Sequence, residues 1–181
     1  MNQKKRNNQI DGSMIFLRNL KKTDATKEYL KWLNSKKINQ FLESRFTKHN
    51  KIDVRKYIEK MNYDPDIIFL AIIRKDNQNH IGNIKLGPIN WNHKYAEIGV
   101  MIGDENSWGK GYASEAIKLI SDFGFNHLKL HKITAGMYEE NIGSIKAFLK
   151  AGFFIEGIRY KHFFFKGKYV NHMLLAKIKK F

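Results

Sequence analysis

One short segment places the strongest constraint on how this chain can fold: a glycine-rich loop at residues 108–114, with the sequence WGKGYAS. It follows a strand-like run at residues 95–102 and opens a helix expected over residues 110–125, where small and apolar side chains recur at helical spacing. The free N–H groups and positive dipole of a helix N-terminus favour an anion, and glycine lets a phosphate approach the backbone closely. The segment therefore predicts a phosphate-binding loop, with glycines that serve only a tight turn as the alternative.

Two common phosphate-binding loops do not fit the spacing. Gly103 and Gly109 are one residue too far apart for a Walker A loop, and Gly111 stands where that loop requires Ser or Thr after its lysine. A dinucleotide fingerprint fits at Gly109 and Gly111 but meets Ser114 in place of its third glycine. Both of these nucleotide sites are therefore disfavoured.

The remaining pattern predicts an α+β (mixed α/β) fold. Strand-like runs occur at residues 14–20, 67–74, 80–86, 95–102 and 132–138, and two closing strands follow residue 153. Helices are expected after residue 23, after Asp53 as a candidate N-cap, and over residues 110–125 and 141–151. The order β-α-α-β-β-β-α-β-α-β-β indicates a mixed sheet with packed helices. We expect one domain over residues 14–181, preceded by a flexible basic segment over residues 1–13.

Composition narrows the class of protein. Apolar residues make up 43% and charged residues 28%, close to globular averages, and the absence of cysteine excludes a disulfide framework and a cysteine nucleophile. The apolar runs are too short to span a bilayer, and residues 1–10 do not resemble a secretory signal. The histidines lack metal-binding spacing. We therefore expect a cytoplasmic protein that binds neither metal nor membrane.

The formal net charge of +16 is unevenly distributed along the chain. Residues 1–60 carry a net +10 and residues 152–181 a net +6, while residues 61–151 are balanced. The excess indicates an anionic partner, with a solvated lysine-rich surface as the alternative. Nucleic acid is disfavoured because lysine greatly outnumbers arginine, whose planar fork reads phosphates and guanines.

Further motifs surround the glycine loop. Ala96-Glu97-Ile98-Gly99 precedes it, Asn141 and Ser144 open a later helix, and KAGF at residues 150–153 with EG at residues 156–157 follows that helix. Together these motifs resemble the GNAT N-acetyltransferase superfamily, most closely its RimJ/RimL-like branch, over nearly the whole chain from residue 14.

The loop itself matches the family pattern Arg/Gln-x-x-Gly-x-Gly/Ala with one departure. Gly111 and Ala113 stand at the fourth and sixth places, whereas Trp108 occupies the first. A tryptophan there departs from the general pattern but is similar to what the RimJ/RimL-like branch carries.

The resemblance implies the GNAT acyl-CoA N-acyltransferase fold, with a central, mostly antiparallel mixed sheet and helices on both faces. It also implies that acetyl-CoA is the acetyl donor and lies between two splayed central strands. Its pantetheine would pair with the backbone of Val100, Met101 and Ile102. Its pyrophosphate would lie at a loop formed by Trp108, Gly109, Lys110, Gly111, Tyr112, Ala113 and Ser114.

Three residues of the later helix are further candidates for binding acetyl-CoA. Asn141 could reach the pantetheine amides or only cap its helix. Lys146 and Lys150 lie on one helix face and could meet CoA phosphates, with a solvated face as the alternative.

The resemblance also assigns the chemical roles of direct acetyl transfer to an amine. Glu97 matches the family's base, and its apolar neighbours suggest partial burial; a solvent-facing glutamate is the alternative. A backbone N–H near Val100 would stabilise the tetrahedral oxyanion. Ser144 and Tyr138 compete to protonate the departing thiolate: Ser144 matches a serine of the branch, whereas Tyr138 is the better acid but is also a candidate packing residue.

The acceptor is the least determined part. Members of the family select it with their first helices and the loop between their last two strands, here residues 21–61 and 163–169. Both lie in the basic parts of the chain, so a polyamine or another polycation is disfavoured and an acceptor in an anionic or acidic context is expected.

The first hypothesis for the acceptor is a protein N-terminal amine, in the manner of RimJ/RimL enzymes. An amino sugar carried on a nucleotide or another small amine, such as an amino acid, is the alternative. A non-catalytic acyl-CoA-binding or nucleic-acid-binding module is a different class. A monomer or a homodimer is expected.

Overall fold

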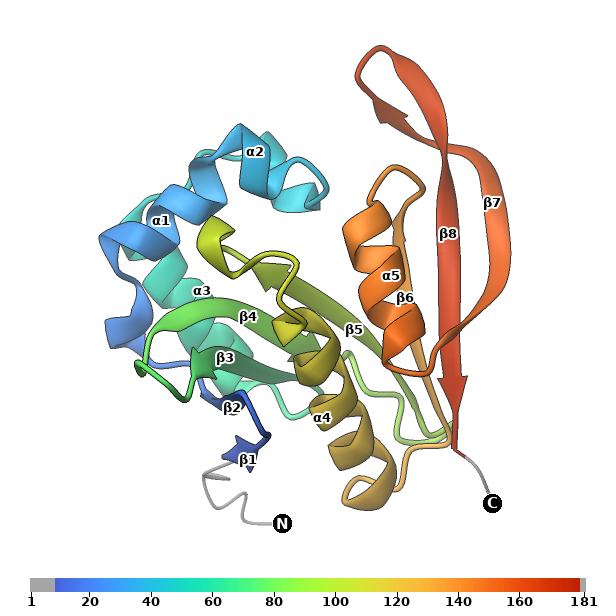
Figure 1. Ribbon diagram of the computed structural model, residues 1–181, viewed down its shortest axis with the longest axis horizontal. Helices are drawn as coiled ribbons and strands as arrows, with labels where there is room; N and C mark the ends of the chain where they lie inside the picture. Colours follow the sequence, from blue (N-terminus) through green and yellow to red (C-terminus); the bar gives the residue numbers. More distant parts are fainter. Residues whose placement is uncertain (1–8, 180–181) are drawn as a thin grey trace.

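The computed structural model describes residues 9–179 of the 181-residue chain and contains an eight-stranded sheet (Figure 1). In chain order the strands are β1 (Ile10–Asp11), β2 (Ile15–Asn19), β3 (Ile68–Arg74), β4 (His80–Leu86), β5 (Tyr95–Ile102), β6 (Lys132–Tyr138), β7 (Phe154–Phe165) and β8 (Lys168–Ile178). The α-helices are α1 (Lys27–Asn34), α2 (Lys36–Asn39), α3 (Lys51–Tyr63), α4 (Tyr112–Asn126) and α5 (Ile142–Lys150). Short 3₁₀ turns are η1 (Lys22–Asp24), η2 (Glu43–Phe46) and η3 (Glu105–Ser107).

The sheet is mixed and mostly antiparallel, as predicted. Its spatial order is β1-β2-β3-β4-β5-β6-β8-β7, and β5 and β6 form its parallel pair. Helices cover both faces, and β4, β5 and β6 have the predicted bounds.

Three features differ from the sequence-based prediction. Strand β1 pairs with β2, Ile10 opposite Leu17, within the segment expected to be flexible; residues 1–8 of that segment lie outside the described residues. Helix α2 and turn η2 are additional elements between α1 and α3. Helix α3 is capped by Asn50, whose Oδ1 accepts the Asp53 N–H at 3.0 Å, so Asp53 lies inside the helix and is not its cap.

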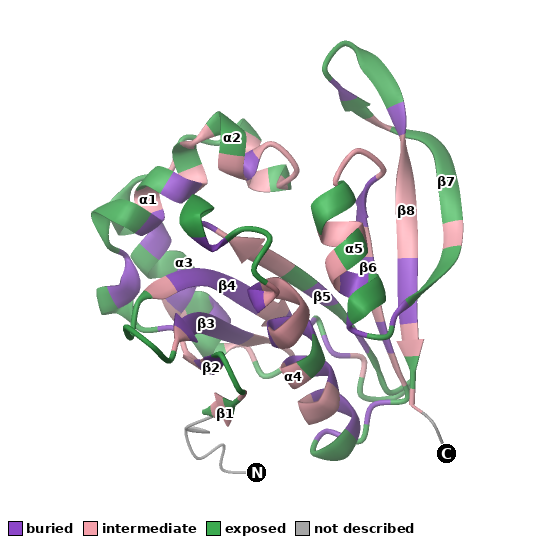
Figure 2. Cartoon of the chain, viewed as in Figure 1, coloured by how far each residue is buried: buried purple, intermediate pink, exposed green. Residues whose placement is uncertain are grey.

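Strand alternation sends side chains into two separate cores on the two faces of the sheet. On β3, Leu70 and Ile72 join the core beneath α4 and α5, whereas Phe69, Ala71 and Ile73 join the core beneath α1 and α3. Burial on both faces explains why β3 is a continuous apolar run without polar alternation. In Figure 2 the buried segments are concentrated in β3 and β4, while most of β7 is exposed.

Strands β5 and β6 stay together for only three residue pairs, from Tyr95 opposite Lys132 to Glu97 opposite Thr134. Beyond them, β5 follows β4 to Ile102 and β6 follows β8 to Tyr138. The two strands diverge in the middle of the sheet (Figure 1). Within the described residues, the far edge of β5 therefore carries no strand pairing to β6, and such an edge can accept an added strand.

Strands β7 and β8 form a long hairpin whose tip projects beyond the helices (Figure 1). Its two turn residues, Lys166 and Gly167, have φ of +48° and +81°, as a type I′ turn requires. The hairpin's inner face contributes Phe163, Phe165 and Val170 to a small aromatic core around Tyr138. This small core places the hairpin beside the end of β6.

Candidate active site

The glycine loop joins β5 to α4 and has an open backbone surface. Gly109 and Gly111 have φ of +73° and +89°, a region that side chains other than glycine rarely adopt. Gly111 is the N-terminal cap residue of α4 and supplies no side-chain acceptor, so the first N–H groups of the helix lack a side-chain cap. A Cβ at Gly109 would meet no atom within 4 Å. This geometry fits a phosphate group at the helix N-terminus.

Trp108 anchors this loop to the end of β5. Its Nε1–H donates to the Ile102 carbonyl at 2.8 Å, and its ring lies 5.6 Å from the Lys37 ammonium. The departure from the family loop pattern therefore has a structural role. Lys110 is exposed beside it, and Tyr112 is buried under the guanidinium of Arg74.

The first turn of α4 and the start of α5 complete this side of the site. Ala113 and Ser114 are half-buried in the first turn of α4, which contacts α5 on the same face of the sheet. Asn141 caps α5, since its Oδ1 accepts the Ser144 N–H at 3.3 Å. The Ser144 hydroxyl is half-buried and has no hydrogen-bond partner among the described residues.

The two lysines of α5 differ from these residues in their exposure. Lys146 and Lys150 are both exposed and form no ion pair with a described residue. Their ammonium groups are thus free to meet an anion on the surface of α5.

Glu97 lies in the last residue pair that joins β5 to β6, directly before the strands diverge. Its side chain is exposed, so the predicted partial burial is wrong. Alternation explains the difference: Ala96 and Ile98 point into the core beneath α4 and α5, and Glu97 points to the opposite face. The carboxylate therefore lies on the α1/α3 face beside the point of divergence.

Tyr138 lies at the end of β6 and is buried, with its ring stacked on Phe163 at a centroid distance of 4.1 Å. Its hydroxyl donates to Glu43 Oε1 at 2.7 Å and accepts from Arg45 Nη2 at 2.8 Å. Burial, followed by the hydrogen bond to Glu43, raises the pKa of Tyr138. The predicted packing role is thus present, and the hydroxyl proton is directed to a carboxylate on η2.

A cavity of about 440 Å³ opens on the α1/α3 face of the sheet. Its floor is formed by β3, β4 and β5, and its walls by α1, η2, α3 and the segment between them. Its lining consists of Tyr29, Leu33, Leu42, Ser44, His49, Asp53, Val54, Tyr57, Phe69, Asn83, Lys85, Gly99, Val100 and Met101. The cavity reaches Gly99 and Val100, close to Glu97 on the same strand.

Two tyrosines line this cavity, the buried Tyr29 and the partly exposed Tyr57, and both are neutral. Burial, together with the nearby Tyr57 and Asp24, raises the pKa of Tyr29, and burial raises the pKa of Tyr57. Neither hydroxyl forms a hydrogen bond to another described residue. The cavity therefore offers polar contacts within largely apolar walls.

Sequence reasoning missed the polar residues of this cavity and the partners of Tyr138. Asn83 and Lys85 interrupt the apolar pattern of β4, which was a usable signal. No comparable signal marks Glu43 and Arg45, because more than ninety residues separate each of them from Tyr138 in the sequence. Among residues 9–179, no group of His, Asp or Glu side chains could hold a metal ion, and no helix is long and apolar enough to cross a membrane.

Comparisons with known proteins bear on this geometry. A family model described as Acetyltransferase (GNAT) domain matches residues 15–154. The Probable N-acetyltransferase YjcK of Bacillus subtilis is 32% identical over 174 residues, which cover 92% of this chain and 95% of that protein.

Two further relatives carry a named substrate. Spermidine N(1)-acetyltransferase of Escherichia coli is 39% identical over 90 residues, 50% of this chain and 48% of that protein. The crystal structure of spermidine N-acetyltransferase from Vibrio cholerae in complex with CoA and spermine matches with a TM-score of 0.81 and 25% identity, covering 92% of this chain and 96% of that one.

Proposed function

This chain belongs to the GNAT acetyltransferase family, and we propose that it transfers the acetyl group of acetyl-CoA directly to the α-amine at the N-terminus of a protein or peptide. The general activity follows from membership of the family: the chain is an N-acetyltransferase with acetyl-CoA as its donor. The roles proposed below rest on one observation, the unpaired edge of β5 beside the glycine loop.

The residues present fit the donor. The edge of β5 through Val100, Met101 and Ile102 lies beyond the pairing with β6 and can pair with the pantetheine amides as an added strand would, with the Ile102 carbonyl also accepting from Trp108. The loop from Trp108 to Ser114 offers N–H groups to the pyrophosphate. Lys146 and Lys150 lie on the exposed surface of α5, where their ammonium groups can attract the phosphates of CoA.

Glu97 serves as the base in this proposal. The acceptor enters as an ammonium ion, and its nitrogen can attack the thioester carbonyl carbon only after it loses a proton. The exposed Glu97 carboxylate takes that proton directly or through water. A backbone N–H near Val100 holds the oxyanion that forms when the nitrogen–carbon bond is made.

Ser144 is the preferred donor of the second proton. When the carbon–sulfur bond breaks, the departing thiolate needs a proton to become free CoA. The Ser144 hydroxyl has no competing partner among the described residues, whereas the Tyr138 hydroxyl donates to Glu43. Ser144 therefore relays a proton from water to sulfur, and Tyr138 orders the wall made by Glu43 and Arg45.

The charge around the cavity supports an acceptor other than a polyamine, even though two relatives are named for spermidine. A polycation requires several carboxylates, but Asp53 supplies the one carboxylate of the described cavity lining and Lys85 faces it from the floor. A peptide N-terminus carries its single ammonium group at one end and neutral amides beyond it. Such a ligand places less positive charge near Lys85.

Release of free CoA thiol in the presence of candidate acceptors tests the proposal. The panel contains short peptides with free N-termini, the same peptides with blocked N-termini, spermidine and a nucleotide-linked amino sugar. We expect release only with the free-amine peptides. Turnover confined to spermidine or to the amino sugar would contradict the proposal, and acetyl-CoA binding without any turnover would favour a non-catalytic module.

A further inference from the structure

One polar group on the floor of the cavity has no partner. Asn83 is only 4% exposed, and its Nδ2 has no hydrogen-bond partner among the described residues. A buried amide N–H that bonds to nothing costs stability, so native proteins rarely leave one without a use. Asn83 also lines the cavity, so a molecule bound there lies against this side chain.

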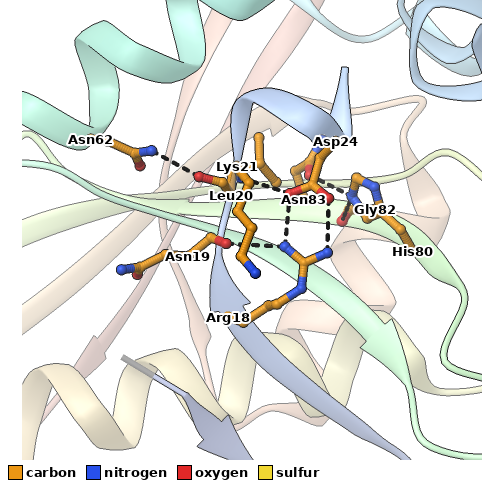
Figure 3. Close-up of polar contacts among 9 residues, drawn as sticks. All are labelled: Arg18, Asn19, Leu20, Lys21, Asp24, Asn62, His80, Gly82 and Asn83. Carbon is orange, nitrogen blue, oxygen red and sulfur yellow. Dashed lines mark hydrogen bonds and ion pairs between the residues drawn. The ribbon is translucent and has the colours of Figure 1, made fainter. Parts of the chain in front are cut away.

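The neighbouring His80 fixes which way this amide points. His80 Nε2 lies 2.9 Å from both the Gly82 carbonyl oxygen and Asn83 Oδ1 (Figure 3). Since the carbonyl can only accept, Nε2 must carry the proton, and Asn83 must present its oxygen to it. The ring of His80 is itself held edge-on against Tyr29 and Trp32. Nδ2 is thereby held on the side of the amide away from His80.

A positive charge stands next to this donor. Lys85 follows Asn83 on the same face of β4, about 7 Å further along the strand, and it forms no ion pair with a described residue. Asp53 already accepts from the Asn50 side chain and is exposed at the rim. Asn83 and Lys85, each with a polar group that has no partner among the described residues, thus line one cavity.

The register of the sheet places these two groups beyond the reacting amine. Lys85 is opposite Gly99 and Asn83 is opposite Met101 on β5. Gly99 is one same-face step of about 7 Å from Glu97, so an acceptor whose amine lies near Glu97 extends naturally toward Lys85 and Asn83. Its remaining body would lie against apolar walls that include Val54 and Phe69.

We propose that the acceptor carries a carboxylate close to its reacting amine, and that Asn83 and Lys85 bind this carboxylate in the cavity. The inference rests on the proposed function. One neutral donor and one ammonium group match a singly charged, planar carboxylate. A phosphate would bring a second charge and further oxygens into a largely apolar space. For a peptide, the carboxylate is an Asp or Glu side chain at the first or second position.

Matched peptides test this proposal. C-terminally amidated peptides with Glu at position one or two are compared with their Gln counterparts, and leucine is compared with leucinamide to test an α-carboxylate as the source. We expect kcat/KM to be roughly ten- to a hundredfold higher for the Glu peptides, the usual range for a hydrogen bond to a charged group. Equal rates for Glu and Gln peptides would overturn the proposal while leaving peptide acetylation intact. A preference only for leucine over leucinamide would overturn the peptide acceptor but keep the carboxylate site.

Variants connect the preference to the two residues. Lys85→Gln should erase the Glu-over-Gln preference mainly through KM, whereas Lys118→Gln, an exposed lysine on α4, removes the same charge and should leave the preference intact. Asn83→Asp keeps the oxygen that faces His80 but replaces the donor by an acceptor, so it should reverse the preference. Asn83→Leu provides a second variant if the buried aspartate unfolds the protein. A preference that survives in Lys85→Gln and Asn83→Leu would overturn the assignment.

Discussion

Replacing Gly111 by valine separates the role of the glycine loop in folding from its role in binding. Gly111 has φ of +89° at the start of α4, where an L side chain is strained. The variant must either hold this strained backbone or move the loop toward ordinary φ. A moved loop no longer offers the same N–H groups to the pyrophosphate.

The structure limits how much stability this change can cost. A Cβ at Gly111 would meet only Met14 Cε, at 3.6 Å, which is ordinary van der Waals contact. The penalty is therefore that of a left-handed backbone, roughly 1–2 kcal/mol. For a chain of this size that corresponds to a fall in Tm of about 2–8 °C. Losing two hydrogen bonds to a charged group should weaken acetyl-CoA binding at least about a hundredfold.

Gly167 provides a matched control. It has φ of +81° in the β7–β8 turn, and a Cβ there would meet nothing within 4 Å. Gly167→Val should therefore show a similar fall in Tm. Calorimetric titration with acetyl-CoA should find wild-type affinity in Gly167→Val and a large loss in Gly111→Val. Affinity within about threefold of wild type in a folded Gly111→Val protein would refute the loop as the pyrophosphate site.

Three further outcomes are expected. Glu97→Gln should lower kcat by roughly 10²–10⁴ with little change in acetyl-CoA affinity, and near-normal turnover would remove Glu97 from the mechanism. Ser144→Ala should lower kcat more than Tyr138→Phe, which should chiefly lower Tm; the opposite order in single-turnover rates would make Tyr138 the acid. Arg18→Met should destabilise the fold by about 1.5–3 kcal/mol at pH 7, because the partly buried Arg18 donates two hydrogen bonds to the Asp24 carboxylate, at 2.7 and 2.8 Å (Figure 3). Burial alone would raise the pKa of Asp24, but hydrogen bonds from Arg18 and a backbone N–H lower it below its ordinary 3.8. The stabilisation from this lowered pKa is present above 3.8 and is lost as pH falls through the lower pKa of the folded state, so the difference in unfolding free energy between wild type and Arg18→Met, measured with urea, should shrink as pH falls below 3.8.

Local patterns made much of the sheet predictable from the sequence. The apolar run of β3, the alternation of β5 and the bounding turns each depend on neighbouring residues alone, and β4, β5 and β6 were placed correctly. The positive φ of Gly111 is equally local, since a glycine before an amphipathic helix is the signal. Strand β1 was missed because two residues carry no period, and it depends on pairing with β2.

Features that depend on distant residues could not be predicted in this way. Tyr138 was a candidate acid by its position on β6, but its hydroxyl partners come from η2, a turn with no sequence signature. The partner of the Asn83 oxygen was equally invisible, since it depends on how the His80 ring is held by α1. Glu97 was expected to be partly buried from its flanking apolar residues, yet in a strand those neighbours report on the opposite face.

The register of β5 links the fold of this protein to its proposed chemistry. On β5, Ala96 and Ile98 bury themselves beneath α4 and α5, and the same alternation points Glu97 and Met101 toward α1 and α3. A shift of one residue would place the Glu97 carboxylate in an apolar core and remove it from the cavity. The burial of Ala96 and Ile98 opposes that shift, because both apolar side chains would move from the core to the opposite face and lose the free energy of burial. The apolar core thus fixes the orientation of the proposed base, although the base itself contributes little to stability.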